Sequence, residues 1–325
     1  MNATLSLHTA VLAVSDLVSA YLDNLELRNR AGLYSTGQRI LVGSYLSDFS
    51  AFYGGNSLES CCNSDLTRWL LAHPTWKADA TKAAALNAVL GCMRWCVDER
   101  LISYNPYRKP KGLRIKPQPR APFTPEEYKS FMSWARNKKG RRKRPSAPAL
   151  RCAAYFLWRT GARTCEMRCL LRCDLDFVEG VARPPHHKTD ETGDPRQFGL
   201  DDRVIRLLRR LTNRIDMRPC RCEESKHREH RRGDHVFVNS RGTAWTKDTF
   251  GKLFRTFARL AGIEKKKTAY CLRHGFCVAA IHKGISDRAI ANQLGHQSTR
   301  MIAWYGRQSR QSAKHLRDVV TRVND

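Results

Sequence analysis

The chain has 325 residues, which is long enough for two domains with separate cores. Apolar residues make up 42% of it, a globular proportion that excludes disorder along the whole chain. Lysine and arginine together number 58 against 30 acidic residues, and the resulting net charge of +28 indicates a polyanionic partner.

Nucleic acid is the first candidate for that partner, and an anionic membrane surface is the second. No segment has the length and hydropathy of a membrane-spanning helix, and the first residues lack the charged region of a secretory signal. We therefore expect a cytoplasmic, DNA-associated protein in a reducing compartment. The twelve cysteines fit this expectation as reduced core thiols; Cys165, Cys169 and Cys173, for example, follow a helical spacing.

Residues 1–104 have the pattern of a small bundle of four helices. The helices are expected to start at Ser15–Asp16, after Ser35, near Ser64 and at Ala80, and the last is expected to end at Asp98. The second should end at Gly54–Gly55 and turn inward the apolar residues Ile40, Leu41, Tyr45, Phe49 and Phe52.

Residues 105–123 differ in composition from the segments on either side. They contain five prolines and six basic residues, so neither a helix nor a central strand can form there. A solvated surface loop is possible, but a basic linker between domains is favoured because a new helix start comes directly after it. Thr124, Pro125 and Glu127 supply an N-cap, a first-turn proline and a capping-box carboxylate.

Residues 124–325 predict a second domain that is mainly α with a small β-sheet, so the whole chain is classed as α+β. Helices are expected over 147–158, 164–172, 202–214 and from Lys247 onward, and strand-like pieces over 175–183, 197–200 and 235–238. The basic cluster Lys138 to Arg144 predicts a loop that is disordered or faces DNA.

Four segments of this second domain carry residues suited to phosphate chemistry. The segment RTGARTCEMRCLL contains Arg163, and Lys188 stands just before a turn. The segments TAYCLRHGF and LGHQSTRMIAWYGR contribute Arg273, His296 and Tyr305. Each has a plain structural alternative: Arg163 could simply pair with Glu166, Lys188 could be a solvated turn residue, and Tyr305 could be a packing aromatic.

Together, these residue types can break a phosphodiester without a metal ion. A tyrosine can form a covalent phosphate ester. Two guanidinium groups suit the charge that gathers on the non-bridging oxygens, and a lysine can protonate or stabilise the leaving oxygen. A histidine can hydrogen-bond a phosphate oxygen.

The order and spacing of these residues resemble the catalytic domain of the tyrosine recombinases, the phage integrase family. Thr160 to Glu166 matches the family's T-G-x-R-x-x-E pattern, and Lys188 matches its β-hairpin lysine. Tyr270 to His274 stands at the H-x-L-R-H pattern, and Leu294 to His296 at L-G-H, with Tyr305 nine residues on as the family's nucleophile. The likeness covers roughly residues 10 to 322.

The resemblance implies a site-specific recombinase or integrase with Arg163, Lys188, Tyr270, Arg273, His296 and Tyr305 as catalytic residues. It implies that residues 1–104 form a DNA core-binding domain, 105–123 a linker and 124–325 the catalytic domain, which together clamp double-stranded DNA. Strands would be exchanged through a 3′-phosphotyrosine within a homotetramer on synapsed sites, with no cofactor. The tail from Gln308 to Val323 would pack on a neighbouring protomer.

The first histidine of the H-x-L-R-H pattern is replaced by Tyr270. A phenol can donate a hydrogen bond to phosphate, but it is a poorer proton shuttle than imidazole at neutral pH. We therefore expect Tyr270 to position the phosphate. For His274, a buried structural hydrogen bond is favoured.

Two other activities remain open at this point. A type IB topoisomerase would use the same chemistry to relax DNA as a monomer, and a non-catalytic DNA-binding descendant would keep the fold alone. The bundle, linker and tail favour the recombinase over the first, and the complete residue set argues against the second.

A Cys/His cluster comes after the predicted helix over 202–214. Cys220, Cys222, His227 and His230 could together bind a structural zinc ion, since two thiolates and two imidazoles can complete a tetrahedral site. The C-x-C and H-x₂-H spacings are tighter than usual, so a weaker site or an ordinary basic loop remain alternatives.

Overall fold

The computed structural model describes residues 13–110, 121–136, 147–184, 196–213, 215–222, 229–264 and 267–310. The chain divides into two compact units, Met1–Gln118 and Pro119–Asp325. This division falls inside the stretch 105–123 in which the sequence predicts a linker.

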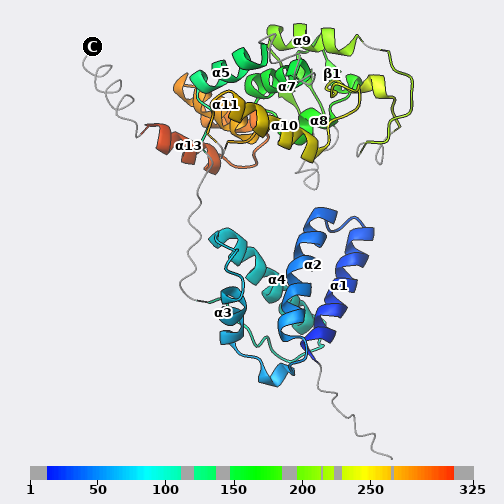
Figure 1. Ribbon diagram of the computed structural model, residues 1–325, viewed down its shortest axis with the longest axis vertical. Helices are drawn as coiled ribbons and strands as arrows, with labels where there is room; N and C mark the ends of the chain where they lie inside the picture. The colour runs from blue at the N-terminus through cyan, green and yellow to red at the C-terminus, as the bar shows by residue number, and fades with distance from the viewer. Residues whose placement is uncertain are drawn as a thin grey trace, which may run out of the picture. The chain divides into compact units, whose positions relative to one another are not determined.

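The first unit is a helical bundle, in which α1 and α2 lie side by side (Figure 1). Its elements are α1 (Val14–Arg30), α2 (Thr36–Tyr53), the short 3-10 helix η1 (Leu58–Ser60), α3 (Asn63–Leu71) and α4 (Asp79–Asp98). All four predicted helices are confirmed. The hydroxyl of Ser35 accepts the N–H of Gln38 and caps α2, as expected for a serine before a helix.

The predicted inner face of α2 is wrong in part. Ile40, Leu41 and Phe52 are exposed, with 60%, 50% and 48% of their surfaces accessible. The buried positions are Leu46, Phe49 and Tyr53, among the residues that pack against α1 and α4. The apolar residues of α2 extend around more of the helix than its two neighbours cover, so apolarity alone did not identify the inner face.

The start of the predicted linker belongs structurally to this bundle. Tyr107 is 2% exposed and packs edge-on against Phe49, with 5.8 Å between ring centroids. The N–H of Arg108 donates to the side chain of Asn63 at the start of α3. The bundle therefore holds Tyr107 and Arg108, at the start of the stretch in which the sequence predicts a linker.

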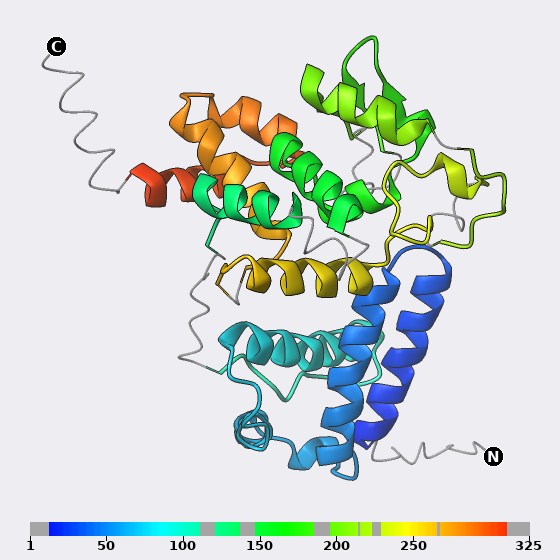
Figure 2. The same ribbon diagram turned by 45° about the horizontal axis from the view of Figure 1, so that its top comes forward.

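The second unit is a helical domain with a small antiparallel sheet, ordered β1-β2-β3. Its first elements are α5 (Pro125–Arg136), α7 (Ala147–Thr160), α8 (Thr164–Cys169), the 3-10 helix η2 (Arg172–Asp174), β1 (Leu175–Asp176), β2 (Val181–Ala182) and β3 (Phe198–Gly199). Its later elements are α9 (Asp202–Thr212), the 3-10 helix η5 (Arg232–Asp234), α10 (Lys247–Leu260), α11 (Tyr270–His282), α12 (Asp287–Leu294) and α13 (Arg300–Arg310). Helices α11 to α13, orange to red, gather at one end of this unit, and α9 lies at the other (Figure 2).

Four predictions for this unit need correction. The strand-like piece predicted over 235–238 forms no strand and has only isolated bridges at His235 and Val238. The stretch 175–183 is a hairpin of two strands, because Gly180 adopts a φ of +66° and turns the chain between β1 and β2. Helix α8 ends at Cys169, earlier than predicted, and gives way to the 3-10 helix η2. Cys173 is consequently exposed, whereas Cys165 and Cys169 are half-buried.

The start of the second unit is fixed as the sequence predicts. The hydroxyl of Thr124 accepts the N–H of Glu127, and the Glu127 carboxylate accepts the N–H of Thr124, which completes a capping box. The same carboxylate pairs with Lys267, a buried lysine whose Nζ also donates to the Pro122 carbonyl at 2.9 Å. These bonds fix the start of α5 to the segment before α11.

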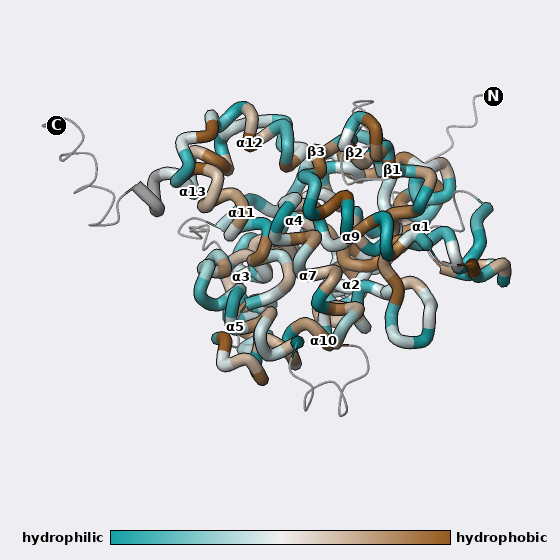
Figure 3. The backbone as a smooth tube through the Cα atoms, turned by 90° about the horizontal axis from the view of Figure 1, so that it is seen from above, coloured by the Kyte–Doolittle hydropathy of each residue, from teal (hydrophilic) through white to brown (hydrophobic). Residues whose placement is uncertain are grey.

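The aromatic core of this unit packs α5, α7 and α10 together through side chains such as Phe131, Phe156 and Phe254. Hydrophilic and hydrophobic residues alternate along α9, which buries one face and exposes arginines on the other (Figure 3). None of the helices among the described residues is long and apolar enough to cross a membrane. The predicted basic loop Lys138 to Arg144 lies outside the described residues.

Candidate active site

Arg163 stands at the turn between α7 and α8. Gly161 makes this turn with a φ of +67°, and a Cβ atom there would lie 2.5 Å from Leu294 and 2.7 Å from Phe276. Only glycine therefore lets the end of α7 approach α11 and α12 this closely. Arg163 then caps α8 and donates through its Nη2 atom to the Gly295 carbonyl at 2.8 Å.

Glu166, fully buried, connects two of the arginines. Its carboxylate accepts the backbone N–H and the Nη1 atom of Arg163, both at 2.7 Å, and the Nε atom of Arg196 at 3.1 Å. Burial alone would raise the pKa of Glu166, but the two guanidinium groups outweigh it and hold the pKa at about 2. The ion pair between Arg163 and Glu166, which the sequence offered as a structural alternative, is therefore present. This ion pair also orients the Arg163 guanidinium group.

Arg273, on the first turns of α11, is 2% exposed. Its Nη1 atom donates to the Gly161 carbonyl at 2.7 Å, and its Nη2 atom donates to the Leu294 carbonyl at 2.5 Å. Within the described part of the chain, no carboxylate lies within ion-pair distance of it. Burial, followed by repulsion from Arg163, lowers the pKa of Arg273 to about 10, which still leaves it charged at neutral pH.

His296 joins this group through a third bond from the Arg273 guanidinium. The Nη2 atom of Arg273 donates to the Nε2 atom of His296 at 2.9 Å, which places the ring proton on Nδ1. The Nδ1 atom is buried and has no hydrogen-bond partner among the described residues. Burial, and then the charge of Arg273, lower the pKa of His296 to about 4, so the ring is a neutral donor at neutral pH.

The L-G-H pattern has a local reason in this geometry. Gly295 ends α12 with a φ of +65°, and a Cβ atom there would lie 2.9 Å from the Arg196 guanidinium. Glycine is needed for both the backbone turn and the close approach. The turn presents the Gly295 carbonyl to Arg163 and aims His296 at Arg273.

Tyr305 lies on α13, packed against α11, and is 4% exposed. Its hydroxyl forms a hydrogen bond with the Nδ1 atom of His274, which directly follows Arg273 in the sequence; the imidazole tautomer sets the direction of this bond. Burial, together with neighbouring Tyr270, raises the pKa of Tyr305 above its ordinary value. The hydroxyl is thus protonated at neutral pH, and it lies within hydrogen-bond reach of an imidazole.

Tyr270 begins α11 beside these residues. Its ring meets the His274 imidazole edge-on, with 4.6 Å between centroids, and 39% of its surface is exposed. Tyr270 therefore borders the His274–Tyr305 pair from the solvent side. Lys188, the sixth predicted residue, lies outside the described residues.

The sequence did not identify the roles of two residues of this site. Arg196 donates to the Glu166 carboxylate and, at 3.1 Å, to the Gln293 carbonyl. In the sequence it is one of 58 basic residues, and no motif distinguishes it. His274 was assigned a structural hydrogen bond. The bond exists, and its partner is Tyr305, the predicted nucleophile.

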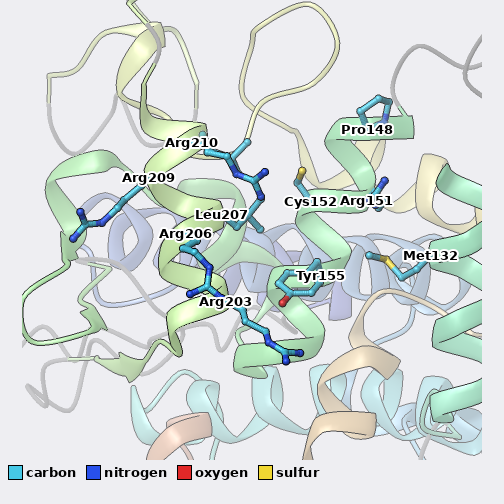
Figure 4. A pocket seen from close by; sticks show the side chains of 11 residues that line it. Met132, Pro148, Arg151, Cys152, Tyr155, Arg203, Arg206, Leu207, Arg209 and Arg210 are labelled. Atoms are coloured by element: carbon cyan, nitrogen blue, oxygen red, sulfur yellow. The ribbon is translucent and has the colours of Figure 1, made fainter.

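A separate cavity between α7 and α9 contains none of these residues. Arginines of α9 project around it, over a floor that includes Leu207 and Tyr155, as Figure 4 shows. Its lining has five arginines and no acidic side chain. The cavity adds to the positive charge of the unit, but it lacks a nucleophile paired with a base, and we do not place the reaction there.

A helical domain with a small antiparallel sheet, in which two arginines meet a histidine near a buried tyrosine, has the architecture of a tyrosine recombinase. Residues 122–312 match the family model described as the phage integrase family. This match covers more than half of the chain, and the chain belongs to that family.

Relatives and solved structures agree with this placement. The chain is 25% identical to tyrosine recombinase XerD of Chlorobaculum tepidum, over 78% of this chain and 81% of that protein. The integrase of transposon Tn1549, in complex with circular intermediate DNA, has a similar fold: TM-score 0.74, 19% identity, and coverage of 95% of this chain and 99% of that one. A lambda integrase tetramer bound to a Holliday junction gives a TM-score of 0.70 at 16% identity, with coverage of 91% and 78%.

Proposed function

We propose that Tyr305 is the nucleophile with which this site-specific recombinase breaks and rejoins DNA strands. The observation that carries the proposal is the state of Arg273. Among the described residues, no carboxylate forms an ion pair with this buried guanidinium, and holding such a charge out of water costs several kcal/mol. A phosphodiester bound there would supply the missing anion and recover that cost.

The reaction can be derived from the donors around that anion. The Tyr305 oxygen attacks phosphorus, a phosphotyrosine bond forms, and the bond from phosphorus to the 5′ oxygen breaks. Arg163 and Arg273 offer guanidinium groups, and His296 offers its Nδ1–H, to the charge that develops on the non-bridging oxygens. The phosphotyrosine retains the energy of the broken bond, so rejoining to a 5′-hydroxyl needs no cofactor.

Two protons have to move in this reaction. His274 is the candidate acceptor for the Tyr305 proton, because it already holds that hydroxyl in a hydrogen bond. The leaving 5′ oxygen must gain a proton, and Lys188 is assigned that role by its place in the sequence alone. Tyr270, neutral and partly exposed, is assigned to hold the phosphate rather than to transfer a proton.

The substrate that fits is double-stranded DNA at specific sites. The net charge of +28 and the family's association with DNA support this partner. The resemblance to a lambda integrase tetramer bound to a Holliday junction supports a homotetramer on synapsed DNA as the working assembly. Such a protein would act where the chromosome is, in the cytoplasm. No observation favours relaxation by a monomer.

The test traps the covalent intermediate. DNA that flanks the gene would be made as a nicked substrate whose cleaved strand loses a short fragment, so that rejoining fails. The expected result is a protein–DNA adduct that maps to Tyr305 and leaves a free 5′-hydroxyl. Recombinants from two copies of the same DNA would separate this activity from simple plasmid relaxation. An adduct through another residue, or a 5′-linked adduct, would contradict the proposal.

A further inference from the structure

The segment between α9 and α10 folds back on itself. Among its described residues there is only the short helix η5 and a few isolated bridges. Pro219 pairs with Arg231, the Cys220 N–H donates to the His230 carbonyl at 3.4 Å, and the Arg232 N–H donates to the Arg218 carbonyl at 3.0 Å. This hairpin-like return places Cys220 directly opposite His230.

Four metal-binding side chains converge inside this return. The Sγ atom of Cys222 lies 3.3 Å from Nε2 of His230 and 3.2 Å from Nε2 of His235. The Sγ atom of Cys220 lies 3.4 Å from Nε2 of His235, and the two Nε2 atoms are 3.0 Å apart. All four donor atoms lie within 4.8 Å of one another.

These separations are close to those around a tetrahedral metal ion. With Zn–S of about 2.3 Å and Zn–N of about 2.0–2.1 Å, sulfur and nitrogen ligands stand about 3.6 Å apart and two nitrogens about 3.3 Å apart. The four observed distances lie within a few tenths of an ångström of these values.

Hydrogen bonding alone accounts poorly for this arrangement. Cys222, His230 and His235 form a triangle with sides of 3.0 to 3.3 Å. Each of these atoms carries at most one hydrogen, and a protonated imidazole nitrogen has no lone pair with which to accept, so the three short sides cannot all be well-aligned hydrogen bonds. A cation at the centre can instead be bound by all of them, and a mixed thiolate and imidazole set in tetrahedral geometry selects zinc.

We propose that Cys220, Cys222, His230 and His235 bind one structural zinc ion. The sequence had pointed to His227 as the fourth ligand, and that residue lies outside the described ones. His235 takes its place, and its spacing from His230 is then H-x₄-H, within the usual range for zinc sites. Only the C-x-C pair remains tighter than usual.

The ion would fasten this segment to the helix that carries Arg163. His235 pairs with Leu171, the N–H of Val236 donates to the Leu170 carbonyl at 3.0 Å, and Arg172 donates to the Gly233 carbonyl at 3.0 Å. Leu170 and Leu171 come directly after α8, whose first turn begins at Arg163. The zinc therefore stabilises the scaffold, and no ligand of it is a predicted catalytic residue.

The experiment measures metal content in the full-length chain purified without added metal. We expect about one zinc per chain, and, after exchange with cobalt, an absorption band from thiolate-to-cobalt charge transfer. Cys220→Ser/Cys222→Ser and His235→Ala should both lose the metal. Two matched controls should keep it: Cys61→Ser/Cys62→Ser, a cysteine pair in the other unit, and His227→Ala, the alternative ligand.

A second measurement covers variants that fold poorly. Chelation of the unmodified chain should lower the melting temperature by several degrees, and added zinc should restore it. The proposal is overturned if the unmodified chain holds no zinc even after incubation with the ion, or if chelation leaves the melting temperature unchanged. It is also overturned if His227→Ala loses the metal while His235→Ala retains it.

Discussion

The second unit contains two clusters of buried and partly buried polar side chains, which differ in the charge of the ligand that would complete them. The arginine cluster consists of Arg163, Glu166, Arg196, Arg273 and His296. It has three guanidinium groups for one carboxylate, so it carries excess positive charge and calls for an anion. The Cys/His cluster, defined by Cys220, Cys222, His230 and His235, directs soft donor atoms at one point and calls for a cation.

This contrast separates a reaction site from a structural one. In the arginine cluster, carbonyls and Glu166 hold the guanidinium groups in place, and the positive charge that Glu166 does not balance can bind an anion. In the Cys/His cluster, the donors point at one another, so an ion there fixes the segment itself. Substitutions in the arginine cluster should lower the cleavage rate, and substitutions in the Cys/His cluster should lower the stability of the fold.

The largest expected effect is that of Tyr305→Phe. Removing the hydroxyl removes the nucleophile, so covalent adducts with a nicked substrate should fall below detection while DNA binding stays nearly unchanged. Gel-shift and adduct assays on the same preparation would measure both. Cys220→Ser/Cys222→Ser is the matched contrast, since it should still form adducts at a temperature where it is folded. Adducts from Tyr305→Phe would mean that another residue is the nucleophile.

Arg273→Ala and Arg163→Ala should each lower the cleavage rate by about 10²- to 10³-fold, the usual cost of losing one preorganised transition-state donor. DNA affinity should change little, because each residue contributes one phosphate contact among many. Arg203→Ala, an exposed α9 arginine at the separate cavity, serves as the control and should keep its rate. Equal losses of rate and affinity in Arg273→Ala would instead indicate a binding role.

A smaller effect concerns stability in acid. The pKa of His296 is about 4 in the folded chain, against an ordinary value of 6.5. Between these values the unfolded chain binds more protons, so the free energy of unfolding should fall as the pH drops from 6.5 toward 4. His296→Gln should flatten this part of the urea-midpoint profile. The Glu166 carboxylate affects stability at lower pH, because its pKa is about 2 in the folded chain against an ordinary value of 4.5. Parallel profiles for both proteins would contradict the burial of a neutral imidazole.

Much of this architecture could be predicted because it depends on short-range rules. The helix starts at Ser35 and Thr124 are set by a cap within three residues, and the structure has both. The segments around Gly161 and Gly295 could be placed together because the family pattern gives their spacing, and the structure joins them through Arg163 and Arg273.

The features that could not be predicted depend on long-range packing. Arg196 reaches Glu166 across 30 positions, and nothing near it in the sequence marks it. His235 was passed over as a ligand because it reads as the start of an apolar strand, and only the return of the chain at Pro219 and Arg231 brings it to Cys222. The exposed face of α2 was missed for the same reason, since its neighbours decide what is covered.

The smallest expected effect, and the finest test of the active site, is that of Tyr270→His. Tyr270 stands where the family has a histidine, edge-on to His274 and partly exposed. If it donates to a phosphate oxygen, histidine can do the same, and the cleavage rate should stay equal or rise a few-fold. Tyr270→Phe keeps the ring packing but removes the donor, so its rate should fall below that of both. A histidine variant as inactive as Tyr305→Phe, beside a phenylalanine variant at full rate, would show that this position acts by packing against His274 alone.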